Sequence, residues 1–285
     1  MAPGSQPAER EALHVGVIAR RTHPANPALS DFCRALEIII GERVAPATLP
    51  TYDAIVEAFG SGEVAFSWLP PLLVVKGRRA GALVPVALPV RGGTPVCSSV
   101  LFTRTNSSMR RVADLRGARV AWVDPQSATG YVVIRATLQA AGVDLERAFG
   151  VDRFVGSHDA VVRAVLSGEA DVGATYAYIS RQRMRVRAAG WGKARVHIIA
   201  RSDPFPAEVL VAAASLPAAS VERLREALVS AGEWGHSEVE RAARALLQAD
   251  RFVAPGDSLE PIATLLCPKQ DEPADEETVR DSEWE

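Results

Sequence analysis

Residues 120–131 read VAWVDPQSATGY and form the most informative segment of the sequence. Val120 to Val123 is an apolar run with the length and character of a buried strand. A polar turn follows it, and the apolar periodicity that resumes after the turn predicts a helix from Gly130 to Ala141. A strand, a tight polar turn and a helix in this order are typical of α/β proteins.

The turn itself predicts a place for an anion. The first amides of a helix have no partners within it and carry a partial positive charge, so a helix start binds an anion without a cationic side chain. Ser127 and Thr129 add hydroxyl donors there, and Gly130 allows a ligand to approach the backbone closely. An ordinary Ser or Thr cap of the helix explains these residues equally well.

A second segment repeats this pattern. Gly156 ends an apolar run, Ser157 can cap a helix, and His158 with Asp159 follow in its first turn. His158 is a candidate donor to an anion, although a surface histidine in a first helical turn is an equal alternative.

Strands and helices alternate along the whole chain, which predicts an α/β architecture with largely parallel sheets. The first unit begins with a strand from His14 to Ala19 and a helix for which Ser30 is the expected N-cap. The alternation restarts after residue 104 and breaks at Pro204. We therefore expect two lobes, formed by residues 13–103 with 204–266 and by residues 104–203. The two crossover strands would serve as hinges, with the ligand cleft between the lobes.

The composition excludes several classes of protein. The formal charge of −2 argues against nucleic acid as a partner. The three cysteines and five histidines are scattered without the spacing of a metal site, so we assign neither a metal nor another cofactor. We expect flexible tails at residues 1–12 and 268–285, the second of which carries eight carboxylates against Lys269 and Arg280.

Membrane and export signals are missing from the sequence as written. No apolar run approaches the ~18–20 residues needed to cross a bilayer, and Met1 to Glu11 contains no apolar export segment. The sequence therefore predicts a cytoplasmic protein. A periplasmic location is the alternative, if an export signal has been removed from the chain.

Several motifs in a fixed order resemble the substrate-binding subunits of ABC transporters for phosphate, phosphite and phosphonate. They are DLRG at 114–117, DPxSxTGY at 124–131, GSHD at 156–159 and VLSGEAD at 165–171. Weaker likenesses at 60–64, 205–206 and 251–253 extend the resemblance over roughly residues 13–266. The resemblance implies the two-lobed type 2 periplasmic-binding-protein fold, and a protein that closes around a small oxyanion without catalysis. It also implies an ABC permease as partner.

The resemblance further implies which residues bind the ligand. Ser127, Thr129 and Gly130 match the oxyanion cradle of the family, with Tyr131 and His158 beside it. The other expected ligand residues are Tyr52 in the first lobe, Trp68 as a wall of the cleft, Ser98 or Ser99 in the first crossover, and Thr175 and Tyr176 at the end of a strand. Core packing is the alternative for Trp68, and a helix-surface position is the alternative for Tyr52.

Two features of the ligand site depart from the family pattern. Ala128 stands where the cradle usually has a middle hydroxyl. The strand that contains Thr175 and Tyr176 has no acidic residue at its tip, although members that bind amino-phosphonates are expected to hold the ammonium group with acidic residues. The second difference argues against a ligand with an ammonium group.

Two other functions fit the same fold. A cytosolic enzyme similar to chorismate dehydratase or to the pyrimidine synthase of thiamine biosynthesis would act on a small aromatic or carboxylate metabolite, with His23, His158 and Asp159 in its site. Cys97 has no recognisable base partner, and the absence of a nucleophile–base pair in the sequence favours binding over catalysis. A cytosolic ligand-sensing domain is the third alternative, whose signalling partner would meet the acidic tail or the basic stretch 181–195.

Overall fold

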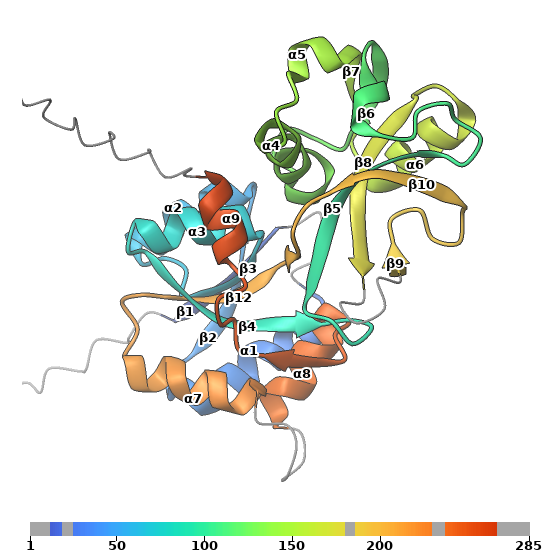
Figure 1. The fold of residues 1–285 in the computed structure, drawn as a ribbon. Coiled ribbons are helices and arrows are strands. Elements are labelled where there is room, and N and C mark those ends of the chain that lie inside the picture. Colours follow the sequence, from blue (N-terminus) through green and yellow to red (C-terminus); the bar gives the residue numbers. More distant parts are fainter. Residues whose placement is uncertain (1–11, 19–24, 180–185, 230–236, 267–285) are drawn as a thin grey trace, which may run out of the picture.

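The computed structural model describes residues 12–18, 25–179, 186–229 and 237–266. Helices and strands interleave along the chain and gather around two separate β-sheets (Figure 1). The predicted two-lobed α/β architecture is confirmed. The predicted flexible tails apart from Ala12, together with His23 and part of the basic stretch 181–195, lie outside the described residues.

The sheet of lobe 1 has the strand order β13-β4-β12-β3-β1-β2. Its strands are β1 (Leu13–Ile18), β2 (Val44–Leu49), β3 (Phe66–Leu69), β4 (Leu83–Val90), β12 (Val209–Ala213) and β13 (Arg251–Val253). β1 runs parallel to β2 and β3, whereas β12, β4 and β13 run antiparallel to their neighbours. The prediction of a largely parallel sheet is therefore wrong, because the strands next to the crossovers do not belong to βαβ units.

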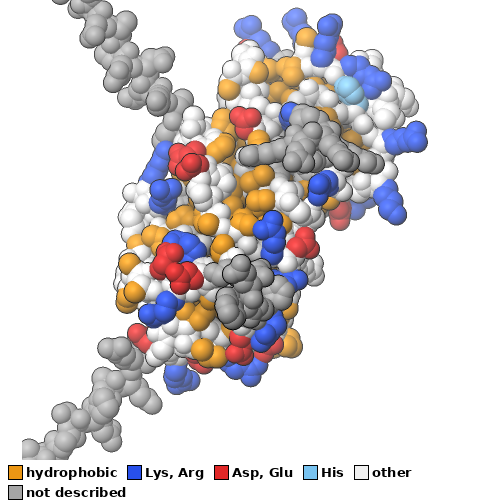
Figure 2. Space-filling view, turned by 60° about the horizontal axis from the view of Figure 1, so that its bottom comes forward, with side chains coloured by type: hydrophobic (Ala, Val, Ile, Leu, Met, Phe, Trp, Pro, Cys, Tyr) orange, Lys and Arg blue, Asp and Glu red, His pale blue; other side chains and the backbone are white. Residues whose placement is uncertain are grey.

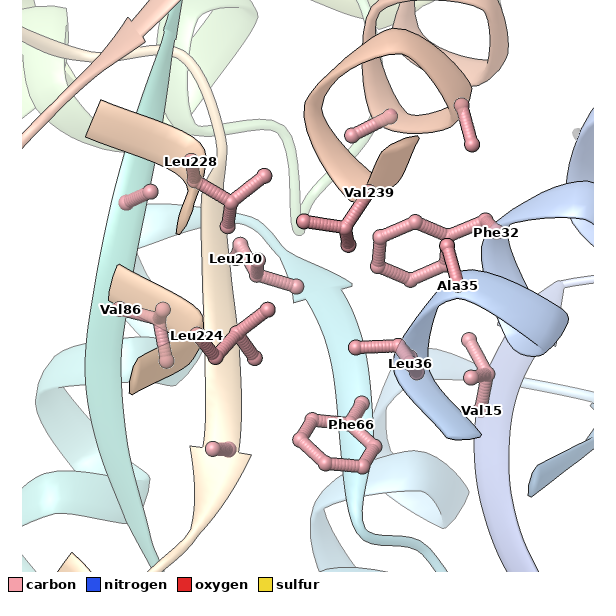
Figure 3. Packing of buried hydrophobic residues seen from close by; sticks show 14 of the residues in the cluster. Val15, Phe32, Ala35, Leu36, Phe66, Val86, Leu210, Leu224, Leu228 and Val239 are labelled. Carbon is pink, nitrogen blue, oxygen red and sulfur yellow. The ribbon is translucent and has the colours of Figure 1, made fainter. Parts of the chain in front are cut away.

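Helices cover both faces of this sheet. They are α1 (Pro27–Ile40), α7 (Ala218–Val229) and α8 (Glu238–Leu247) on one face, and α2 (Tyr52–Ser61), α3 (Pro71–Arg79) and α9 (Glu260–Leu266) on the other. Figure 3 shows the first face, where Phe32 and Leu36 of α1 meet Phe66 and Leu210 of the sheet and Leu224 of α7. Burial of these side chains supplies the main stabilisation of the lobe.

The start of α1 corrects one prediction. The helix begins at Pro27 rather than after Ser30. The side chain of Asn26 accepts a hydrogen bond from the amide of Ala28 (3.0 Å), and proline suits the first helical position because its missing N–H has no partner to lose there.

The sheet of lobe 2 has the order β10-β5-β8-β6-β7, with β11 beside β5 and β9 beside β8. Its strands are β5 (Val96–Arg104), β6 (Ala118–Trp122), β7 (Phe149–Phe154), β8 (Val172–Ile179), β9 (Val186–Ala189), β10 (Val196–Arg201) and β11 (Phe205–Pro206). The helical segments are η1 (Val112–Leu115), η2 (Ala128–Val132), α4 (Val133–Ala140), α5 (Leu145–Ala148) and α6 (His158–Ser167). As predicted from residues 120–131, β6 leads through a polar turn into the continuous helix of η2 and α4.

The strand pairing moves the first crossover. The sequence-based boundary puts β5 in lobe 1, but β5 pairs with β8 and β10 of lobe 2. An apolar run such as β5 looks alike in either sheet, so its sequence cannot tell which sheet it joins. The second crossover lies between β10 and β12, and β11 pairs with the start of β5, so the crossovers run side by side. We infer lobes of 13–90 with 209–266 and of 96–201.

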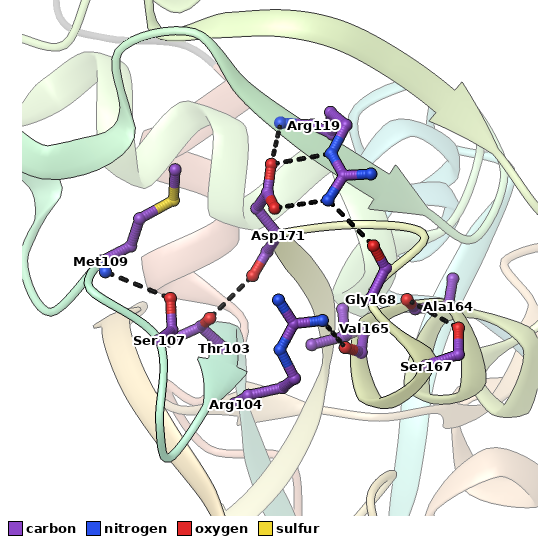
Figure 4. Close-up of polar contacts among 10 residues, drawn as sticks. All are labelled: Thr103, Arg104, Ser107, Met109, Arg119, Ala164, Val165, Ser167, Gly168 and Asp171. Atoms are coloured by element: carbon purple, nitrogen blue, oxygen red, sulfur yellow. Dashed lines mark hydrogen bonds and ion pairs between the residues drawn. The ribbon is translucent and has the colours of Figure 1, made fainter.

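An ion pair in lobe 2 anchors α6 at its C-terminal end. Asp171 accepts hydrogen bonds from the backbone amide, Nε and Nη2 of Arg119, at 3.0, 3.0 and 2.7 Å (Figure 4). Arg119 also donates to the carbonyl of Gly168 (2.9 Å), and Arg104 donates to the carbonyl of Val165 (3.0 Å). The last turn of α6 is thus tied to β5 and β6, which fixes the helix whose other end begins at His158.

Candidate ligand-binding site

A cleft of about 940 Å³ lies between the two lobes. Lobe 1 contributes the first turns of α2 and α3 to its lining, and lobe 2 contributes the turn before η2 and the first turn of α6. The crossover segments add Arg91, Cys97 and Glu208. The starts of four helices therefore meet at one cavity, and each start carries a partial positive charge.

The start of η2 is the position best built for an anion. Ser127 caps it by accepting a hydrogen bond from the amide of Gly130 (3.0 Å), and the amide of Val132 donates to the Ser127 carbonyl (2.9 Å), which makes a wide π-type turn. Among the described residues, no group accepts from the amides of Ala128 and Thr129. Both residues line the cleft, so these two donors are available to a ligand there.

A cluster of side chains holds Thr129 and His158 in place. His158 Nδ1 lies 2.9 Å from Thr175 Oγ1, and His158 Nε2 lies 3.4 Å from Thr129 Oγ1. Ser99 Oγ donates to the carbonyl of Thr129 (2.5 Å). Thr175 and Ser99 are fully buried, so they act on the cleft through the residues they hold rather than by lining it.

The structure brings part of the predicted site together at the cleft. The lining includes Tyr52, Ser127, Thr129, His158 and Tyr176. The ring of Tyr176 stands edge-on to the imidazole of His158, with centroids 5.1 Å apart.

Other predicted residues lie behind the lining. Gly130 is buried, and a Cβ added to it would lie 2.2 Å from Cγ2 of Val123, so its small size serves packing beneath the turn. Tyr131 packs edge-on against Trp122 (5.5 Å), below the guanidinium of Arg135 (5.0 Å). Ser98 is 5% exposed within β5, where it pairs with Ala177 of β8.

The prediction of Trp68 as a cleft wall is wrong. Its ring lies 5.3 Å from Phe32 and stacks on Phe252 at 6.4 Å, within the core of lobe 1. Side chains alternate between the faces of a strand, and Trp68 shares the α1-facing side of β3 with Phe66. Core packing, the alternative at this position, is what the structure shows.

Comparison with known proteins identifies the family. Residues 15–259 match the family described as ABC transporter, phosphonate, periplasmic substrate-binding protein. The chain belongs to this family. The membership supports a solute-binding role.

One curated relative of this phosphonate-binding family member is the Phosphate-import protein PhnD of Mycolicibacterium smegmatis (strain ATCC 700084 / mc(2)155). It is 27% identical over 151 residues, which are 49% of this chain and 47% of the relative, so the match spans about half of that protein.

Solved structures share the fold of the phosphonate-binding family. XAC2383 from Xanthomonas citri, bound to chloride ion, has a TM-score of 0.70 at 19% identity, with 90% of this chain and 97% of that chain covered. PhnD1 from Prochlorococcus marinus (MIT 9301), in complex with methylphosphonate, has a TM-score of 0.61 at 18% identity, covering 89% and 96%. No helix among the described residues of the present chain has the length and apolar character needed to span a membrane.

Sequence reasoning missed one charged pair in this phosphonate-family cleft. Arg91 forms an ion pair with Glu208 and donates to the carbonyl of Leu247 through Nε (3.1 Å) and Nη2 (2.6 Å). Burial acts to lower the pKa of Arg91, but Glu208 and the hydroxyl of Tyr178 outweigh it and raise that pKa. The two residues are 117 positions apart, with Arg91 directly after β4 and Glu208 directly before β12, so no local pattern could have joined them.

Cys97 does not supply a nucleophile at the cleft between the lobes. Burial raises the pKa of its thiol to about 12, which leaves essentially no thiolate at neutral pH. The same burial, with the neighbouring thiol, raises the pKa of Tyr178 to about 12. The Cys97 thiol and the Tyr178 hydroxyl therefore line the cleft as uncharged groups, which agrees with binding rather than catalysis.

Charged side chains alone do not give this cleft an affinity for anions. Among the residues that the structure describes, the lining has two cations, Lys76 and Arg91, and three carboxylates, Asp53, Asp124 and Glu208. On the face drawn in Figure 2, acidic and basic side chains are interspersed as well. Within the described lining, attraction for an anion therefore comes mainly from the helix starts, whose amides and dipoles act at short range.

Proposed function

We propose that this protein captures a ligand with a small phosphate- or phosphonate-like oxyanion group and closes its two lobes around it. The oxyanion would accept hydrogen bonds from the amides of Ala128 and Thr129, the hydroxyl of Thr129 and Nε2 of His158. The observation that carries this proposal is that these donors converge on one cleft while the two amides lack a protein acceptor in the described residues.

Closure needs only that the ligand binds the closed arrangement more tightly than the open one. Lobe 2 supplies the cradle, and lobe 1 brings the starts of α2 and α3, with Tyr52, to the other side of the ligand. The paired crossovers, where Phe205 lies opposite Cys97, are the expected hinge.

The partner we propose is the permease of an ABC transporter, which would receive the loaded, closed protein. Family membership also supports work in the periplasm. Fractionation of the native host tests this location: we expect the protein in the osmotic-shock fluid, whereas recovery only with cytosolic markers would favour a cytoplasmic role.

Isothermal calorimetry with phosphate and methylphosphonate tests the oxyanion cradle. Thr129→Val removes one hydroxyl at nearly constant volume, and Ser127→Ala removes the cap that shapes the turn. Each variant is expected to bind at least tenfold more weakly, since a hydrogen bond to a charged group contributes about 1.5–3 kcal/mol.

Ser61→Ala is the matched control, because the Ser61 hydroxyl bonds the Ala58 carbonyl in the last turn of α2, away from the start of that helix at the cleft. It should bind like the parent. If both cradle variants also bind like the parent, the oxyanion does not sit at this turn.

A further inference from the structure

The lobes already touch across the cleft. Nε2 of Gln126, beside the cradle, donates to Oδ2 of Asp53 at the start of α2 (3.1 Å). Although this contact joins the lobes, about 940 Å³ of cleft remains. Pockets of roughly 300–1,000 Å³ hold drug-sized organic ligands. The space therefore exceeds what an inorganic oxyanion fills and leaves room for an organic group.

The remaining space has an apolar and aromatic side. The rings of His158, Tyr176 and Tyr178 follow one another edge to face, with centroid separations of 5.1 and 5.9 Å. This row leads from the cradle towards the crossovers, since Tyr178 bonds Arg91. Leu72 and Leu73 of α3 add an aliphatic surface from lobe 1. Such surfaces bind apolar and aromatic groups.

The carboxylates of the cleft are engaged by the protein. Asp53 accepts a hydrogen bond from the side-chain amide of Gln126, and Asp124 accepts one from the backbone N–H of Gln126 (2.9 Å). Glu208 pairs with Arg91, which the Leu247 carbonyl holds in place. The Arg91 and Glu208 side chains are 29% and 24% exposed, so an ammonium group would have to displace a partly desolvated ion pair to reach Glu208.

We propose that the ligand is either a phosphonate or a phosphate monoester whose organic group is uncharged and apolar or aromatic. Arg91 excludes ammonium-bearing ligands because its ion pair with Glu208 keeps that carboxylate from binding them. This inference rests on the proposed function. The oxyanion sits at the cradle, and the organic group lies along Tyr176 and Tyr178 against Leu72 and Leu73.

Calorimetry on the parent protein tests the ligand class with phosphate, methylphosphonate, phenylphosphonate, phenyl phosphate and 2-aminoethylphosphonate. We expect a phenyl-bearing ligand to bind at least tenfold tighter than methylphosphonate, and 2-aminoethylphosphonate to bind more weakly than methylphosphonate. The two phenyl ligands distinguish a phosphonate from a phosphate monoester. Phenyl ligands no tighter than methylphosphonate would overturn this inference alone, whereas no binding by any oxyanion would overturn the proposed function.

Arg91→Met tests the exclusion of ammonium as a gain of function. Release of Glu208 should raise the affinity for 2-aminoethylphosphonate relative to methylphosphonate at least tenfold. The double variant Arg91→Met/Glu208→Gln should return that ratio to the parent value. An unchanged ratio in a folded Arg91→Met protein, judged by its melting curve, would overturn the role of Arg91. If Arg91→Met does not fold, tight binding of 2-aminoethylphosphonate by the parent would overturn that role equally.

Discussion

Thr175 Oγ1 lies 2.9 Å from Nδ1 of His158, at a position on β8 that solvent does not reach. When this hydroxyl donates to Nδ1, the neutral imidazole carries its proton on Nε2, which faces Thr129 and the cleft. We therefore expect Thr175 to act as a positioning residue that, by donating to Nδ1, favours the tautomer of His158 able to donate to an oxyanion.

Thr175→Val should weaken oxyanion binding while the fold persists, because valine keeps the volume and removes the hydroxyl. Loss of the correct tautomer costs one charge-assisted hydrogen bond, so we expect a roughly tenfold higher Kd by calorimetry. Thr175→Ser restores the hydroxyl and should bind nearly like the parent. NMR of ¹⁵N-labelled histidine reads the tautomer directly, and an Nε2-protonated ring in Thr175→Val would exclude this role.

Removal of the hydrogen bond between Gln126 and Asp53 should change the spacing of the two lobes. Gln126→Ala removes a contact between exposed side chains that is worth less than about 1 kcal/mol. We expect the ligand-free variant to have a larger radius of gyration by small-angle X-ray scattering, and saturating methylphosphonate to return it to the parent value. Gln139→Ala, on the exposed side of α4, serves as the control. Identical scattering from Gln126→Ala and the parent would mean that other contacts set the spacing.

The ion pair between Asp171 and Arg119 should make part of the stability of the fold depend on pH. The hydrogen bonds donated by Arg119 lower the pKa of Asp171 below its ordinary value of 3.8. A carboxylate with a lowered pKa stabilises the fold above the ordinary value, and this contribution is lost as the pH falls through the folded-state pKa. Asp171→Asn should therefore lower the melting temperature at pH 7 by roughly 2–4 °C, for about 1 kcal/mol.

The same difference should shrink as the pH falls below 3.8, because the parent then loses the contribution as well. Asp31→Asn removes an exposed ion pair with Arg34 and should leave the melting temperature within about 1 °C at every pH. A melting difference for Asp171→Asn that stays constant from pH 7 to pH 3 would assign its effect to packing rather than to charge.

The sequence predicted the parts of the site that one continuous segment encodes. Ser127 and Ser157 each cap the helix that follows them, and both turns reach the cleft. Local rules of capping and periodicity suffice for such positions. Trp68 was open to two interpretations, because strand alternation gives two faces without telling which one meets the cleft.

The pairing of Arg91 with Glu208, and of Gln126 with Asp53, lay beyond sequence reasoning. Each pair joins segments that only the final arrangement of two lobes brings together. The sequence-based assignment of β5 to lobe 1 was wrong for the same reason, since β5 pairs with β8 of lobe 2. Contacts between distant segments depend on topology, and one sequence carries no local signal for them.

Gly130, beneath the cradle turn, and Gly60, within α2, give a paired prediction. A Cβ at Gly130 would lie 2.2 Å from Cγ2 of Val123 and 2.8 Å from Ser127 Oγ, so Gly130→Ala must shift the cradle turn. We expect a loss of about 1–3 kcal/mol in stability and weaker oxyanion binding. Gly60 lies within α2 with open space around its Cβ position, so Gly60→Ala should gain about 0.5–1 kcal/mol with unchanged binding. Thermal melting and calorimetry on both variants test the pair: if Gly130→Ala keeps both stability and affinity, the turn yields easily and its shape does not set the oxyanion site.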